Sequence, residues 1–236
     1  MCTVTYIPTN KGIILTSNRD ESKSRDVNHL IKYKAENKIV TFPPDSIGGT
    51  WIGCNSQNEI ICLLNGAFIK HKHRPPYKHS RGLIVKSFLE SNKRINTLLH
   101  DIDLNGIEPF TLIYTNEEKL IELRWDERIK HIRTLNINEA HIWSSSTLYD
   151  KGIQRKKTDF FKAQLINTSS NNLDTILDFH RSKPFGDGVN DIVMDRDVVA
   201  TISITHIERT KEKTTLSYHN LLKNNTISSI VHAPNH

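Results

Sequence analysis

Three features of the sequence could carry chemistry: Cys2, the tetrapeptide Asn18-Arg19-Asp20-Glu21 and the segment Gly48-Gly49-Thr50-Trp51-Ile52-Gly53. Removal of Met1, which a small second residue permits, would make Cys2 the first residue, with a thiol and an α-amine on one Cα. The thiol is a strong nucleophile once ionised, and the amine, with an ordinary pKa of about 7.7–8.0, can act as its base near neutral pH. One residue would then supply both nucleophile and base.

Two short strands are expected to position this residue. Residues 3–7 alternate Val4 and Tyr6 with threonines, and residues 12–17 hold a short apolar run. Between them, residues 8–12 have the proline, asparagine and glycine of a tight turn. The start of the chain is therefore predicted to be a β-hairpin.

The hairpin would bring charged residues to Cys2. A turn centred between Asn10 and Lys11 pairs positions whose numbers add to a constant, which sets Cys2 opposite Arg19 with Asp20 one step beyond. A guanidinium there would favour the thiolate and hold a substrate carboxylate or carbonyl, and a carboxylate would orient the amine. A different turn type would shift this pairing by one residue.

Each feature also has a structural interpretation. Cys2 could be a small apolar residue at a strand start, and residues 19–21 a surface charge cluster. For residues 48–53 we favour a structural role, in which glycines permit a tight turn and Trp51 anchors a strand in the core. Cys54 and Cys62 fall within expected strands and are predicted to be buried structural cysteines.

The remaining pattern predicts more strands and three helices. Short turns rather than helical crossovers join the strands, which favours an α+β fold with mainly antiparallel sheets and helices on their outer faces. We expect one domain over residues 1–236, since no linker or repeat divides the chain. The expected strands are 38–42, 50–55, 59–64, 110–115, 119–125, 129–135, 140–143, 198–207 and 214–218, and the expected helices start at Ser80 or run over 149–166 and 173–181.

Composition excludes several classes of protein. The 236 residues carry a net charge of +6, but the one dense basic run, residues 70–81, contains a single aromatic and predicts a solvated loop, not a nucleic-acid surface. The histidines of that run, His71, His73 and His79, lack a cysteine or carboxylate at ligand spacing, so no metal is expected. No nucleotide-binding motif predicts a cofactor.

The chain is also expected to stay out of membranes. It has neither a long apolar stretch nor a secretory leader, and three cysteines do not make a disulfide framework. These observations predict a reduced, cytoplasmic protein without stable membrane insertion.

Several of these motifs occur together in one known family. The sequence resembles the NRDE family, also called the Transport and Golgi organisation protein 2 family, named for the tetrapeptide at residues 18–21. The likeness is strongest over residues 1–90 and continues more weakly toward the C-terminus. It rests on Met1-Cys2, Ser17-Asn18-Arg19-Asp20-Glu21, Gly48-Gly49-Thr50-Trp51-Ile52-Gly53, Leu64-Asn65-Gly66, Ser80-Arg81-Gly82, Trp143-Ser144-Ser145-Ser146-Thr147 and Thr201-Ile202-Ser203-Ile204-Thr205.

That family resembles N-terminal nucleophile hydrolases of the penicillin V acylase and bile-salt hydrolase type. The resemblance implies a four-layer αββα sandwich, two mainly antiparallel sheets between helix layers. It also implies a role for each of six residues. Cys2 would be the nucleophile, Arg19 and Asp20 its charged neighbours, Asn65 an oxyanion-hole donor, and Asn18 and Ser146 substrate-binding residues. Ser146 stands where the acylases have a second asparagine, which is a departure from their pattern.

Two functions follow as hypotheses. In the first, the protein hydrolyses a linear amide that is not a peptide bond, with Cys2 as nucleophile. In the second, it is a non-catalytic binding or carrier protein concerned with haem or lipid handling, a role to which the family has been linked. The expected partner is a small-molecule amide or a hydrophobic ligand.

Overall fold

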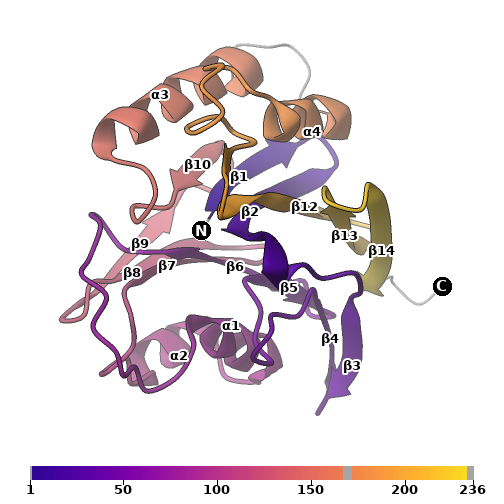
Figure 1. Cartoon of the computed structure of the whole chain (residues 1–236). Helices are drawn as coiled ribbons and strands as arrows, with labels where there is room; N and C mark the ends of the chain where they lie inside the picture. The colour runs from indigo at the N-terminus through magenta and orange to yellow at the C-terminus, as the bar shows by residue number, and fades with distance from the viewer. Residues whose placement is uncertain (1, 167–171, 233–236) are drawn as a thin grey trace.

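The computed structural model describes residues 2–166 and 172–232. Two antiparallel sheets lie face to face, and a pair of helices covers the outer face of each (Figure 1). One pair is α1 (Arg81–Glu90) with α2 (Ile95–Asp101), and the other is α3 (Lys151–Phe161) with α4 (Leu173–Arg181). The predicted αββα sandwich is therefore confirmed.

The first sheet holds the N-terminal strand between two others. Its order is β10–β1–β2–β12–β13–β14, and the two-residue strand β11 pairs with β12. The strands are β1 (Cys2–Thr9), β2 (Gly12–Ser22), β10 (His141–Ser144), β11 (Asp195–Arg196), β12 (Val199–Thr210), β13 (Thr214–Asn220) and β14 (Asn225–His232).

The second sheet follows the chain strand by strand, in the order β3–β4–β5–β6–β7–β8–β9. Its strands are joined by short turns, except at the longer loop of residues 43–51 between β4 and β5, and between β6 and β7, where α1 and α2 are inserted. The strands are β3 (Ile31–Ala35), β4 (Lys38–Phe42), β5 (Ile52–Asn55), β6 (Ile60–Asn65), β7 (Phe110–Thr115), β8 (Leu120–Trp125) and β9 (Lys130–Leu135).

Strand alternation divides the side chains among three apolar layers. Val4, Tyr6 and Leu15 join the core between the sheets, whereas Ile7 and Ile14 pack under α3 and α4. A third cluster lies between the second sheet and helices α1 and α2. Burial of each large aliphatic side chain stabilises the fold by roughly 1.5–3 kcal/mol. The alternation also fixes the face on which the later residues of β2 lie.

Helices α1, α3 and α4 begin where side chains cap them. The Ser80 hydroxyl accepts from Gly82 N (3.2 Å), as the sequence predicts for α1. The Asp150 carboxylate accepts from Ile153 N (2.9 Å), so α3 starts two residues later than expected. After α3, the π-helical turn η2 (Lys162–Ile166) continues the segment to the expected end. Within the described residues, no helix has the length and apolarity needed to cross a bilayer.

Four elements were missed by the sequence pattern. They are the edge strands β3 and β14, the short strand β11 and the seven-residue helix α2. The 3-10 turn η1 (Lys23–Arg25), directly after β2, was also not anticipated. The two edge strands alternate exposed and half-buried residues, so they lack the apolar content by which the interior strands were recognised.

Candidate active site

The β1–β2 hairpin has the predicted register. Cys2 pairs with Arg19, Val4 with Ser17 and Tyr6 with Leu15, and the turn closes at the Thr9–Gly12 pair. Position 12 requires glycine, because a Cβ there would lie 1.9 Å from the carbonyl oxygen of Arg209 in β12. The hairpin therefore brings Cys2 and Arg19 together by backbone pairing alone.

The charged side chain of Arg19 is buried and is positioned by two contacts. Its side chain is 4% exposed, and Nη1 donates to the Arg25 carbonyl oxygen (3.0 Å). The guanidinium carbon lies 3.9 Å from the ring centroid of Trp51, a cation–π contact. Trp51 belongs to the core between the sheets, as predicted, and it also supports the cation beside Cys2. That second role was not anticipated.

Close backbone packing explains the glycines around Trp51. A Cβ on Gly49 would lie 2.5 Å from the carbonyl carbon of Gly82, at the start of α1. A Cβ on Gly53 would lie 2.7 Å from the Leu89 side chain of the same helix. The favoured structural role of this segment is therefore supported, since its glycines let α1 approach.

Asp20 lies on the opposite face of β2 from Arg19, under the helices. Its side chain is fully buried, with Oδ1 accepting from the Thr201 hydroxyl (2.7 Å) and Oδ2 from the Tyr149 hydroxyl (2.9 Å). Burial raises the pKa of this carboxyl, and the Lys157 ammonium and the two hydrogen bonds oppose the rise. The acid is thus enclosed and fully hydrogen-bonded on the far side of the strand.

A β-bulge gives Asp20 one of these partners. The β2–β12 register shifts between Thr201, which pairs with Asp20, and Ser203, which pairs with Arg19. In an unbroken strand two residues of odd number would face the same way, but the extra residue turns Thr201 toward the helix layer. Bulges of this kind are frequent next to active sites.

Three strand ends meet at the edge of the sandwich where Cys2 lies. Thr3 of β1 pairs with Ser144 of β10, and the next residue, Ser145, donates its hydroxyl to the carbonyl oxygen of Asn65 (2.8 Å). Asn65 ends β6 in the other sheet. This bond joins the two sheets at the site and brings Asn65 to the same edge as Cys2.

The backbone N–H of Asn65 is directed away from β7. Gly66 N–H donates to the Pro109 carbonyl oxygen (2.9 Å), so Gly66 continues the row of hydrogen-bonded pairs one step past Asn65–Phe110, although Pro109 has no N–H to return a bond. Such pairs alternate, and the Asn65 N–H therefore points to the other side of β6. On that side β5 begins only at Ile52, opposite Cys62. Asn65 and Arg19 both line a small cavity of about 90 Å³ there.

Ser146 packs against the glycine that follows Asn65. A Cβ on Gly66, whose φ is +83°, would lie 2.3 Å from the Ser146 hydroxyl oxygen. The hydroxyl donates to the carbonyl oxygen of Ile69 (3.4 Å). Ser146 therefore lies next to the predicted oxyanion donor, with its proton directed to a neighbouring backbone carbonyl.

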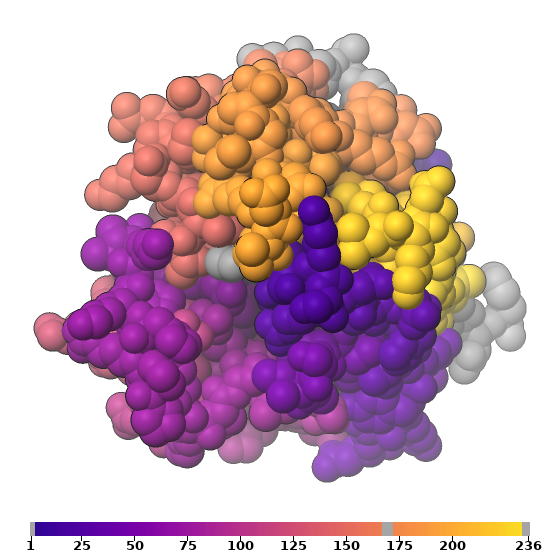
Figure 2. Space-filling view, viewed as in Figure 1, coloured from indigo at the N-terminus to yellow at the C-terminus, as the bar shows by residue number. Residues whose placement is uncertain are grey.

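A larger cavity opens beside Ser146. It has a volume of about 780 Å³, and its walls include the apolar side chains of Phe68, Ile69 and Leu148, together with Tyr149 and Arg196. In Figure 2 the surface is hollowed where the salmon loop after β10 meets the purple loop after β6. This cavity is large enough for a drug-sized organic molecule.

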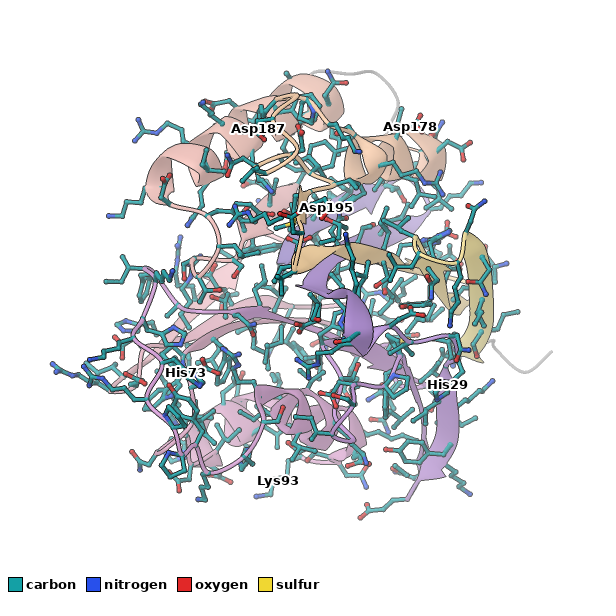
Figure 3. The ribbon with its side chains drawn as sticks, in the orientation of Figure 1. His29, His73, Lys93, Asp178, Asp187 and Asp195 are labelled. Carbon is teal, nitrogen blue, oxygen red and sulfur yellow. The ribbon has the colours of Figure 1, made fainter. Side chains whose placement is uncertain are left out.

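The rim of the site includes the loop before β12. Lys23 of η1 forms an ion pair with Asp195 (2.9 Å), which Figure 3 labels at the front edge of the first sheet. Figure 2 shows this orange loop lying against the indigo segment that follows β2. Loops from both halves of the sequence thus surround the strand ends.

Asn18 occupies a different environment from the one predicted. Its side chain is fully buried, and Nδ2 donates to the carbonyl oxygens of His180 and Ile192 (both 2.9 Å). Its Oδ1 lies 2.5 Å from His180 Nδ1. The amide is occupied by contacts that anchor α4 and the following loop, so the structure lends no support to substrate binding by Asn18.

Two cysteines and two histidines singled out in the sequence do not join the site. Cys54 and Cys62 are completely buried, as predicted, and burial raises the pKa of the Cys54 thiol. His71 and His73 both contact Glu108, at 2.9 and 3.2 Å. Over residues 2–166 and 172–232, no three histidine, cysteine or acidic side chains are grouped so as to hold a metal ion.

The sequence reading missed three residues around Asp20: Tyr149, Lys157 and Thr201. Lys157 carried a detectable signal, because it lies four residues from both Ile153 and Phe161 on the apolar stripe of α3. A lysine on such a stripe is rarely buried without a partner. Tyr149 and Thr201 gave no comparable signal, since their contacts depend on a loop conformation and a bulge.

Solved structures with the same architecture are N-terminal nucleophile hydrolases. An N-acylethanolamine-hydrolyzing acid amidase ortholog of Caenorhabditis elegans matches with a TM-score of 0.61 and 10% identity, over 87% of this chain and 92% of that one. Penicillin V acylase from Agrobacterium tumefaciens matches with a TM-score of 0.59 and 10% identity, over 98% and 86%. The C2A mutant of the conjugated bile acid hydrolase from Clostridium perfringens gives 0.58 and 11%, over 100% and 99%.

These similarities establish the class of the fold, which is that of the N-terminal nucleophile hydrolases. At such low identity they establish the fold alone. The chain belongs to the Transport and Golgi organisation 2 family, whose model matches residues 1–229. Searched by sequence, the curated proteins gave no match.

Proposed function

We propose that this protein hydrolyses linear amide C–N bonds other than peptide bonds, with Cys2 as the nucleophile once Met1 has been removed. The observation that carries the proposal is the convergence of strand ends. Backbone pairing sets Cys2 opposite Arg19, and the Ser145–Asn65 bond brings the end of β6 to the same edge. A cavity of about 780 Å³ adjoins this edge at Ser146.

The groups at this edge suit acyl transfer. The Cys2 thiolate would attack the amide carbonyl, and its own α-amine would take up the thiol proton and deliver it to the leaving amine. The buried Arg19 guanidinium, on the residue paired with Cys2, would favour the thiolate form. The Asn65 N–H, which points away from β7, would donate to the oxyanion, a contribution of about 10²–10³ in rate for one such donor. Water activated by the amine would then release the acyl group.

The larger cavity indicates the kind of substrate. Phe68, Ile69 and Leu148 give it an apolar wall, while Arg196 adds a polar group. Phe68 and Ile69 remain 44% and 67% exposed, so apolar surface is left for a ligand to cover. A small-molecule amide with a hydrophobic acyl group fits this lining.

The first test is the pH dependence of Cys2 alkylation by limiting iodoacetamide, read by mass spectrometry of the N-terminal peptide. We expect Met1 to be absent and Cys2 to react well below the ordinary thiol pKa of about 8.5. Cys54 and Cys62, both buried, are internal controls in the same sample. Retention of Met1, or a Cys2 no faster than these two thiols, would contradict the proposal.

A panel of acyl amides then tests turnover. The wild-type protein should release amine from at least one hydrophobic acyl amide, and Cys2→Ala should abolish that release. Persistence of the same turnover in Cys2→Ala would exclude the nucleophile role, whatever the reactivity of the thiol.

One observation favours the non-catalytic alternative. The Ser146 hydroxyl donates to Ile69 O, so its proton is not directed to an oxyanion. A carrier of haem or lipid would use the same apolar cavity without needing that donor. Titration with haemin and with a fatty acid distinguishes the two: saturable binding by a protein that cleaves none of the amides supports the carrier, and binding that never saturates counts against it.

A further inference from the structure

A lysine is completely buried behind the candidate nucleophile. Lys157 projects from α3 into the layer between that helix and the first sheet, where its side chain has no exposed surface. The ammonium donates to the Thr3 hydroxyl oxygen (3.2 Å) and to the Asp191 carbonyl oxygen (3.1 Å). Thr3 follows Cys2 directly in β1, so the ammonium contacts the side chain next to the candidate nucleophile.

Tyr149 lies between this ammonium and the Asp20 carboxylate. Lys157 Nζ is 3.5 Å from the centroid of the tyrosine ring, and the tyrosine hydroxyl donates to Asp20 Oδ2 (2.9 Å). A cation on the ring face and an anion on the hydroxyl polarise the same side chain in the same direction. The tyrosine therefore couples a buried cation to a buried anion that do not touch.

The charged groups around Lys157 are three carboxylates and one guanidinium. Asp20 on β2 and Asp187 in the loop before β11 attract the ammonium, as does Asp191, whereas Arg196 on β11 repels it. Figure 3 labels Asp187 in the loop that passes in front of α3 and α4. His180 of α4 also lies nearby, but burial lowers its pKa to about 3, so it is neutral above that pH. Burial lowers the pKa of Lys157 to about 8, and Asp20 is the largest opposing influence.

We propose that Lys157 is a positioning residue of the N-terminal site: it holds the start of β1 through Thr3 and, through Tyr149, keeps Asp20 ionised. The claim that this site is catalytic rests on the proposed function, but the coupling of Lys157 to Asp20 does not. An ionised Asp20 would attract the ammonium that the Cys2 α-amine becomes when it takes up the thiol proton. Without the buried cation, enclosure of Asp20 would favour its neutral form.

The Asp20 carboxyl can be titrated directly by ¹³C NMR of protein labelled at aspartate, with its resonance assigned by its loss in Asp20→Asn. In Lys157→Met, which keeps the length of the side chain, we expect the Asp20 titration to move to higher pH by one unit or more. Lys156→Met is the matched control, since Lys156 is the exposed neighbour on the same helix and should leave Asp20 unchanged. Lys157→Arg keeps the charge and should restore a titration close to that of the wild type.

A second variant separates the contacts. Tyr149→Phe keeps the ring against the ammonium but removes the hydrogen bond to Asp20. The pH at which Asp20 titrates is expected to rise, but by less than in Lys157→Met. This variant also serves if Lys157→Met does not fold. The inference is overturned if Asp20 titrates as in the wild type in the folded Lys157 or Tyr149 variants, or if Lys157→Arg shifts it as much as Lys157→Met does.

Wild-type Cys2 alkylation, measured in parallel, keeps the two proposals apart. An ordinary Cys2 together with a shifted Asp20 in Lys157→Met would overturn the hydrolase proposal and support the assignment of Lys157. An activated Cys2 with an unshifted Asp20 would do the reverse.

Discussion

The Thr201 hydroxyl lies 2.7 Å from the Asp20 carboxylate because the register of β12 shifts at the next residue. The bulge lets one strand present Thr201 to the helix layer and Ser203 to the space between the sheets. Asp20 therefore receives the Thr201 hydroxyl on the helix side of the sheet, whereas its neighbour Arg19, on the other face, pairs in the strand ladder with Ser203. The site is thus built through the thickness of the sheet, with the guanidinium on one side and the acid on the other.

Thr201→Val should leave Asp20 with one hydroxyl donor and destabilise the protein. Loss of a hydrogen bond to a buried, charged group costs about 1–3 kcal/mol. Thr16→Val is the control, because the buried Thr16 hydroxyl has no hydrogen-bond partner among the described residues and its replacement should be neutral or stabilising. Denaturant unfolding of both variants measures the difference, and equal stability would show that the Thr201–Asp20 bond contributes nothing.

Arg19→Gln should make Cys2 less acidic. Removal of a buried positive charge from the residue paired with Cys2 would disfavour the thiolate, and we expect the midpoint of the alkylation profile to rise by roughly one pH unit. Arg25→Gln is the matched control: that guanidinium contacts Glu21 and Ser46 at the rim, while the Arg25 carbonyl oxygen that binds Arg19 is retained. A larger shift in Arg25→Gln than in Arg19→Gln would contradict the assigned role.

Gly66→Ala should disturb the site sterically. The new methyl group would lie 2.3 Å from the Ser146 hydroxyl oxygen at a φ of +83°, and overpacking of this kind costs about 1–3 kcal/mol. Gly186→Ala is the control, since φ there is +67° with nothing within 4 Å, so it bears only the backbone strain of about 1–2 kcal/mol.

Removal of the Ser146 hydroxyl should relieve part of the effect. In Gly66→Ala combined with Ser146→Ala, we expect the free energy of unfolding to recover by more than the effect of Ser146→Ala alone. Strict additivity of the two changes, measured by a double-mutant cycle, would show that these side chains do not compete for the same space.

Acid should destabilise the protein through His180. Burial lowers the pKa of this histidine to about 3, below the ordinary value of about 6.5, so the unfolded chain binds a proton that the folded protein excludes. The stabilising contribution is complete above about pH 6.5 and is lost as the pH falls toward 3.

The slope of stability against pH measures this effect. Between pH 4 and 6, His180→Gln should reduce the slope of the free energy of unfolding by up to one proton, about 1.4 kcal/mol per pH unit. His29→Gln, at an exposed position, should leave the slope as it is. An unchanged slope in His180→Gln would mean that the folded protein accepts the proton.

Local pattern was enough to predict the hairpin and its register. The Cys2–Arg19 pairing follows from a turn of fixed length, and strands β4, β7 and β8 and helix α4 follow from apolar periodicity. The face on which a residue of β2 lies could also be deduced from alternation. These features depend on residues close together in the chain.

The acid network could not be predicted in this way. Whether Thr201 reaches Asp20 depends on a bulge, and whether Lys157 is buried depends on how α3 docks against a strand formed by the first residues of the chain. The structural role of Asn18 could not be predicted either, because its hydrogen-bond partners on α4 and the following loop are distant in sequence. Spacing alone does not distinguish an amide that anchors a helix from one that binds a substrate.

The position of β1 between β2 and β10 has a consequence for the order of folding. The β1–β2 hairpin closes a short loop. The Thr3–Ser144 strand pair and the Thr201–Asp20 hydrogen bond, in contrast, form only when distant segments of the chain come together. Contacts between distant segments carry a larger loop-closure cost and slow the folding of β-rich proteins. We therefore expect the candidate site to be completed late in folding, so the removal of Met1 that the proposed function requires would precede the docking of β10.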